Sequence, residues 1–127
     1  MDYYGKMRTN WFTITDEQRL LDLVEKLEGE GLKIRRKNNS VCITCLGQIY
    51  FDERDISDSD FYVHMQSIIA EDDAMLVTEI GSEGTRYFCA YADIITRKDI
   101  TYIDLQRQVE EKVSVLLGGS WSGSFCY

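Results

Sequence analysis

Two hairpin patterns in the sequence require an antiparallel sheet. In the first, strand-like residues 32–34 and 40–46 flank Asn38-Asn39, a pair that tolerates the positive φ of a tight turn. In the second, apolar-rich residues 74–80 and 85–96 flank a turn predicted at Gly81–Gly84. A further turn at 97–99 leads into a strand at 100–104. Because hairpins dominate, the sheet is predicted to be mostly antiparallel.

Three amphipathic segments predict helices. Thr15 and Gln18 form a capping box for the first helix, the second covers about 59–70, and Asp104 caps the third. The chain contains no proline, so glycine, asparagine and charge must end its elements. The helices are predicted to present the sets Leu20, Leu23, Val24, Leu27; Phe61, Met65, Ile68, Ile69; and Leu105, Val109, Lys112, Val113, Leu116.

With a short strand at 11–14, the predicted order is β-α-β-β-α-β-β-β-α. We expect an α+β fold with a mostly antiparallel sheet and the helices on one face. The first six elements match the ferredoxin-like order, which many unrelated functions share. A chain of 127 residues predicts one domain, 1–127, and we expect its ends, 1–9 and 119–127, to be flexible.

Composition favours a soluble globular protein, with 44% hydrophobic and 28% charged residues. No apolar stretch is long enough to span a membrane, and the first residues lack the apolar core of a secretory signal. We therefore expect a cytoplasmic protein that does not engage membranes and whose four cysteines are reduced.

Aromatic residues crowd both ends of the chain. They can pack against the sheet or serve as anchors for a partner, and the sequence favours packing. The residues concerned are Tyr3, Tyr4, Trp11, Trp121, Phe125 and Tyr127.

The motifs that could carry chemistry have simpler structural interpretations. Cys42 and Cys45 form a C-x-x-C, but on a strand they point to opposite faces, which argues against zinc or a disulfide.

His64, the only histidine, could act as a general base oriented by Asp60, although a boundary histidine is the simpler interpretation. The segment Gly81–Gly84 lacks the features of a phosphate loop. We expect no catalytic residues and no cofactor.

A strong local acidity is the remaining signal. Residues 52–73 carry −7 of the net charge of −8, with Arg54 as their only base. No calcium-loop register fits this segment. The acids could cap a helix, or they could imitate phosphates for a basic groove, and both interpretations stay open. The short basic run at 33–37 is too small to indicate nucleic-acid binding alone. The predicted partner-binding residues are Asp52, Glu53, Asp55, Asp58, Asp60, Tyr62, Glu71, Asp72 and Asp73.

Two features of the chain resemble those of a known class of proteins. They are the acidic segments at 52–60 and 71–73 and the hairpins at 72–105. The chain resembles the small acidic anti-CRISPR and antirestriction proteins of phages and mobile elements. The resemblance implies a non-enzymatic inhibitor in the cytoplasm of a bacterial host. Such a protein would bind a basic partner, such as a nuclease or CRISPR effector, and block its nucleic-acid channel without binding nucleic acid itself. An immunity or accessory protein that neutralises a basic toxin is the alternative, and a small enzyme is third. The oligomeric state stays open.

Overall fold

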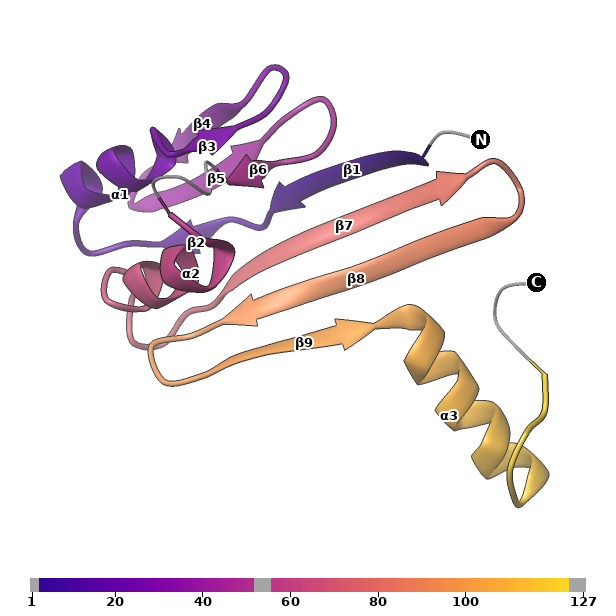
Figure 1. Ribbon diagram of the computed structural model, residues 1–127. Helices are drawn as coiled ribbons and strands as arrows, with labels where there is room; N and C mark the ends of the chain where they lie inside the picture. The colour runs from indigo at the N-terminus through magenta and orange to yellow at the C-terminus, as the bar shows by residue number, and fades with distance from the viewer. Residues whose placement is uncertain (1–2, 52–55, 124–127) are drawn as a thin grey trace.

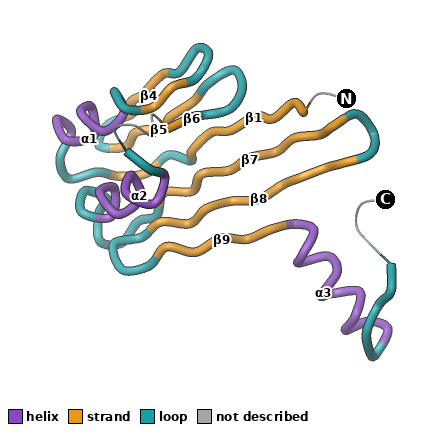
Figure 2. Tube along the Cα trace, viewed as in Figure 1, coloured by secondary structure: helices purple, strands orange, loops and turns teal. Residues whose placement is uncertain are grey.

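The computed structural model describes residues 3–51 and 56–123, which form an α+β fold with a mostly antiparallel sheet, as predicted (Figures 1 and 2). The elements are β1 (Tyr3–Thr9), β2 (Phe12–Thr13), α1 (Glu17–Val24), β3 (Leu27–Glu28), β4 (Lys33–Lys37), β5 (Ser40–Thr44), β6 (Tyr50–Phe51), α2 (Asp58–Gln66), β7 (Met75–Glu83), β8 (Tyr87–Ile95), β9 (Ile100–Asp104) and α3 (Leu105–Leu117).

The main sheet has the order β4-β5-β1-β7-β8-β9, with β2 also paired to β5 and every pairing antiparallel. The part β1-α1-β4-β5-α2-β7 places its first strand between its third and its fourth. This is the ferredoxin-like arrangement that the element order predicts. Strands β8 and β9 extend the sheet beyond β7, and β3 pairs with β6 in a separate small sheet.

Strands β1 and β2 are one long strand interrupted at Asn10 and Trp11. The two halves differ by one residue in their register with β5, as a β-bulge requires. At the interruption the Asn10 backbone amide still donates to Leu76 O, and its side chain adds two bonds to the same segment: the amide donates to Ala74 O, and the oxygen accepts from Leu76 N. The bulge therefore keeps this strand joined to β7 while it shifts toward β5.

Helices α1 and α2 cover one face of the sheet (Figure 1). The predicted apolar residues of α2 and of its C-terminal turn are all buried, and so are Leu20, Leu23 and Val24 of α1. Each large side chain buried in this way contributes about 1.5–3 kcal/mol. The fully buried side chains include Phe12, Leu20, Ile43, Met65, Ile69 and Met75.

Residues 3–9, expected to be a flexible end, instead form β1 in the middle of the sheet. Seven consecutive residue pairs join β1 to β7, from Tyr3–Glu83 to Thr9–Val77. This pairing satisfies the backbone of a segment whose own pattern is a weak strand signal, because Gly5 interrupts it. The glycine-containing turn is also shorter than predicted. Gly81 belongs to β7, and the turn comprises residues 84–86 and begins at Gly84, which has φ 58°.

The third helix departs from the predicted layer. Asp104 caps it, as predicted, by accepting a hydrogen bond from Arg107 N, and Gly118 ends it with φ 72°. However, α3 buries none of its residues and projects from the end of β9 (Figure 1). Helix α1 is capped by Asp16 and not by Thr15. No helix in the described residues is long and apolar enough to cross a membrane.

Candidate functional site

Two of the predicted partner-binding acids lie on the first turn of α2. Asp58 and Asp60 are exposed, and the Ser57 hydroxyl caps the helix by accepting a hydrogen bond from Asp60 N at 3.1 Å. Acids in this position interact favourably with the positive end of the helix. Three further predicted acids, Asp52, Glu53 and Asp55, lie outside the described residues.

Glu71 and Asp72 lie beyond the other end of α2. Both are exposed, whereas Asp58 and Asp60 lie on the first turn of the nine-residue helix, so the rest of α2 lies between the two pairs. Within residues 3–51 and 56–123, no ion pair joins any of these four acids to a base. The predicted cluster is thus two separate acidic pairs, one at each end of the helix.

Helix α1 adds further acids to the same layer. Glu17 and Asp22 are exposed on the helix, and Glu25 follows its last residue. Glu17 pairs with Arg36 of β4, so this acid is partly neutralised. The layer formed by α1, α2 and the residues that follow each helix is therefore acidic, and we call it the acidic helix layer.

Tyr62 was predicted as an exposed partner contact, and this prediction is wrong. Its side chain is 7% exposed, and its hydroxyl donates to Asp93 Oδ2 at 2.6 Å. Burial and this hydrogen bond both raise the pKa of Tyr62. The residue lies on the side of α2 that faces the sheet, where its ring contacts Phe51 and Phe61. A tyrosine hydroxyl is compatible with burial when it finds such a partner.

Asp73 has a structural role. Its carboxylate accepts hydrogen bonds from Thr13 N at 2.7 Å and from Ala74 N at 2.8 Å. Burial alone would raise its pKa, but the backbone hydrogen bonds outweigh burial and the pKa is lowered. Asp73 therefore fastens the turn after α2 to β2, and its oxygens are already occupied.

The only histidine does not meet its predicted carboxylate. His64 Nδ1 lies 3.0 Å from Arg19 Nη2, and a guanidinium only donates hydrogen bonds, so Arg19 is the donor. No hydrogen bond between His64 and Asp60 is found in the described residues. The ring is an exposed contact between α1 and α2.

The two thiols of the C-x-x-C have different surroundings. Cys42 Sγ donates to Thr9 O at 3.2 Å, whereas Cys45 Sγ donates to Gly47 O at 2.9 Å. Cys45 packs against the core, and Cys42 is buried outside that cluster. Both are free thiols, and the described residues hold no group of three or more side chains arranged for a metal ion.

A buried carboxylate that sequence reasoning missed lies on β7. Glu79 is 6% exposed and accepts hydrogen bonds from the Tyr3 hydroxyl at 2.6 Å and from Gln48 Nε2 at 3.3 Å. Tyr3 lies over Gly81, where a Cβ would be only 2.3 Å from its hydroxyl. Burial is the main cause that raises the pKa of Tyr3. It is also the main cause for Tyr91, which lies opposite Glu79 on β8. The cluster is a satisfied polar network.

The face of the sheet opposite α1 and α2 has the opposite charge. Strand register places residues opposite one another on the same face, so Arg8 of β1, Thr44 of β5 and Lys33 of β4 share it. We call this the open face. Its exposed cations are Lys6, Arg8, Lys33, Arg35 and Lys37.

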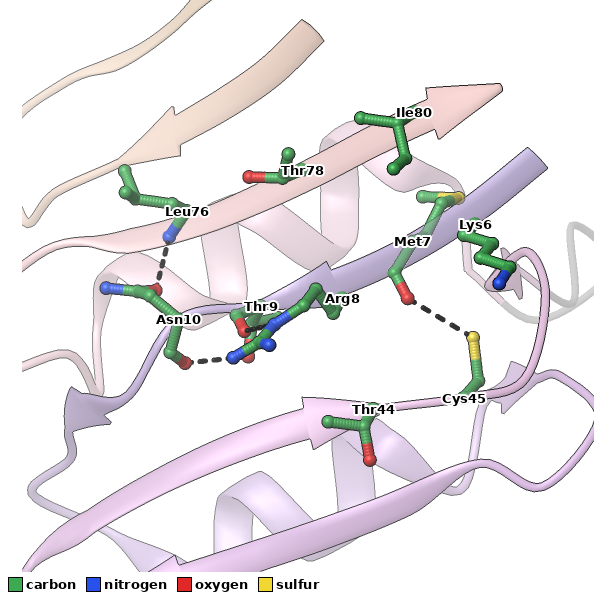
Figure 3. Close-up of a pocket in the computed structure, with 10 residues that line it drawn as sticks. All are labelled: Lys6, Met7, Arg8, Thr9, Asn10, Thr44, Cys45, Leu76, Thr78 and Ile80. Atoms are coloured by element: carbon green, nitrogen blue, oxygen red, sulfur yellow. Dashed lines mark hydrogen bonds between the residues drawn. The ribbon is translucent and has the colours of Figure 1, made fainter. Parts of the chain in front are cut away.

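A groove of about 530 Å³ lies among these strands (Figure 3). It forms where β5 separates from β1, since these strands share only the residue pair Arg8–Thr44. Lys6 and Arg8 line it, with Leu76, Thr78 and Ile80 of β7. The groove combines an apolar floor with cationic walls. The alternation of Lys6 and Arg8 in the sequence indicates that both lie on one face of a strand. Only the strand order of the sheet shows that this face also carries the basic residues of 33–37.

Comparisons with protein-family models, with curated proteins and with solved structures find no match for this chain. Any function must therefore be argued from its surfaces.

Proposed function

We propose that this chain is a non-enzymatic protein-binding module that inhibits a nuclease of a bacterial defence system. Its acidic helix layer would occupy the basic groove in which that nuclease holds nucleic acid. The observation that supports this proposal is the set of four exposed acids at the two ends of α2, Asp58, Asp60, Glu71 and Asp72, which form no ion pair in the described residues.

Unpaired acids favour binding more than folding. Glu71 and Asp72 gain little from the fold, because neither forms an ion pair in the described residues and both lie past the C-terminal end of α2, where a negative charge is not favoured by the helix dipole. A row of such charges steers a basic partner and is matched by its lysines and arginines. Because the two pairs lie at opposite ends of α2, one helix presents charge to two sites of a groove.

Inhibition by occupancy needs no catalytic group. The side chain best suited to proton transfer, His64, contacts Arg19 on the protein surface and does not line the groove beside Lys6 and Arg8. Inhibition would therefore depend on the charge and shape of the acidic helix layer.

The experiment is a phage-plating assay in bacteria that carry a defined CRISPR or restriction system. Expression of the chain should restore plating. Neutralising the acids, in the variants Asp58→Asn with Asp60→Asn and Glu71→Gln with Asp72→Asn, should abolish the effect.

A matched control neutralises exposed acids outside the acidic helix layer, in Asp99→Asn with Glu111→Gln, and should keep full activity. Purified wild type should also bind the nuclease with an affinity that falls steeply with salt. Equal activity of the acidic-layer variants and the control would refute the proposal. Protection against a basic toxin without any effect on phage would point to the immunity-type alternative.

A further inference from the structure

The open face of the sheet is basic in an acidic protein. Its described strand positions hold five exposed cations, Lys6, Arg8, Lys33, Arg35 and Lys37, and no acid. The chain as a whole has 22 acids and 14 bases, so this face has the opposite charge to the molecule. No ion pair in the described residues ties any of the five to a carboxylate.

Protection of an exposed sheet edge explains only part of this charge. Strand β4 is an edge, and natural proteins place lysine on edges to prevent pairing with other chains. Lys6 and Arg8 are different. Arg8 pairs with β5 on one side and with β7 on the other, and beside Lys6 the Met7 amide donates to Gly47 O, so the loop after β5 covers this part of β1. Cations in the middle of a sheet do not guard an edge, and their charge needs another explanation.

Two exposed aromatic rings continue the same face. Tyr4 is 74% exposed and Phe88 is 49% exposed. Register places Tyr4 opposite Ser82 and Ser82 opposite Phe88, so the two rings stand in one row on either side of a small side chain. They are two strand spacings, about 10 Å, apart. Planar rings in such a row are suited to stack on bases.

We propose that the open face binds single-stranded nucleic acid. Bases stack on Tyr4 and Phe88, and the backbone runs along β1 over Lys6 and Arg8 toward β4. Alternate residues of a strand are about 6.6 Å apart, so these two cations can meet successive phosphates of an extended strand. From Tyr4 to Arg8 the path is about 13 Å, and Lys33 lies about 10 Å further, across two strand spacings.

The aromatic row favours nucleic acid over an acidic peptide, since a peptide of acids has no aromatic rings to stack on Tyr4 and Phe88. The groove beside Lys6 and Arg8 adds an apolar floor for sugars and base edges. The negative charge of the acidic helix layer does not prevent binding. Layers pack roughly 10 Å apart, and exposed charges are screened over about 10 Å at 0.1 M salt.

The test measures fluorescence anisotropy of a labelled single strand of about ten nucleotides, a length within the range of such sites. Each phosphate contact contributes about −0.7 to the slope of log affinity against log salt. Five contacts predict a slope of about −3 to −4. A duplex and a poly-glutamate peptide of equal charge serve as competitors.

Three open-face cations are neutralised in the test variant and three cations elsewhere in the control. The test variant should bind about tenfold more weakly or worse, with a slope of about −1 to −2, while the control matches wild type. Thermal unfolding confirms that both are folded. The test variant is Lys6→Gln, Arg8→Gln, Arg35→Gln, and the control is Arg36→Gln, Lys98→Gln, Arg107→Gln.

The aromatic row has its own test. Tyr4→Ala and Phe88→Ala should each lower affinity by about fivefold or more, whereas Tyr102→Ala, an exposed ring on the opposite face, should not. Four results would overturn the proposal: no binding at low salt, equal loss in the control, equal competition by poly-glutamate, or self-association of the chain through this face. The proposal concerns a different face from the proposed function, so the failure of either leaves the other standing.

Discussion

Replacing Tyr62 by phenylalanine removes one hydrogen bond from the interior and leaves the ring in place. The hydroxyl donates to Asp93 Oδ2 at 2.6 Å, and the ring packs between α2 and the small sheet through Phe51 and Phe61. Hydrogen bonds to charged groups contribute about 1.5–3 kcal/mol. Because Asp93 is half-buried and water can replace part of the bond, we expect a loss near the lower end, about 2 kcal/mol, at about pH 8.

The same substitution changes the dependence of stability on pH. Burial first, and then the bond to Asp93, raise the pKa of Tyr62 in the folded state, while an unfolded tyrosine ionises near pH 10. Above about pH 10 the unfolded chain loses this proton and the folded chain keeps it, so stability falls as pH rises toward the folded-state pKa. At about pH 11 the loss is about 1.4 kcal/mol. Phenylalanine does not ionise, so the difference between the two proteins should shrink to about 0.6 kcal/mol.

The assay is urea unfolding followed by circular dichroism at about pH 8 and about pH 11. Tyrosines common to both proteins cancel in the difference. Tyr50→Phe is the matched control, since Tyr50 is 55% exposed and a surface change of this kind costs within about 0.5 kcal/mol. A Tyr62→Phe variant that is as stable as the control, or a stability difference that does not change with pH, would refute the reasoning.

Three further substitutions test local features. Asp73→Asn should cost about 1–2 kcal/mol at neutral pH, because one of the amides of Thr13 and Ala74 loses its acceptor. Since the fold lowers the pKa of Asp73, acid urea titrations should show this difference vanish as pH falls from about 4 through the folded-state pKa. Asn38→Val should lower Tm by the equivalent of about 1–2 kcal/mol, because φ is 56° there, whereas Asn38→Gly should not. Ser57→Ala should cost about 1 kcal/mol in thermal unfolding, and no loss would show that the cap of α2 is dispensable.

A turn, a helix cap and a helix end that depend only on neighbouring residues were predicted correctly from the sequence. The turn at Asn38, the cap at Asp104 and the stop at Gly118 are all found where the residue types placed them, since each is decided within a few residues. The apolar face of α2 was also predictable, because it follows a period of 3.6 residues.

Features that depend on distant partners were not predictable in this way. The backbone of β1 is satisfied by β7, and the Tyr62 hydroxyl by Asp93, a residue 31 positions away. Neither partner is visible in a local window. The polarity of tyrosine suggested a surface position, whereas the tertiary hydrogen bond allows a buried one.

The charge pattern shows the same limit. Residues 33–37 read as a short basic run, and Lys6 and Arg8 as isolated cations, until the sheet places β4, β5 and β1 side by side. For the acidic residues of 52–73 the structure has the opposite effect, because it separates charges that are close together in the sequence. The described part of it is divided by α2 into two pairs, and Asp73 serves the fold. Net charge along the chain is therefore a poor guide to which charges share a face.

The central position of β1 also has a consequence for synthesis. The strand leaves the ribosome before its partners in β7, from Val77 to Glu83, which follow about 70 residues later. At about 5–20 residues per second this delay is several seconds. During that time the emerging chain can form the β4–β5 hairpin and the first helix, but one side of β1 has no partner. We therefore expect the sheet to close only after β7 has been made, and nascent chains that end before residue 75 to remain sensitive to proteases.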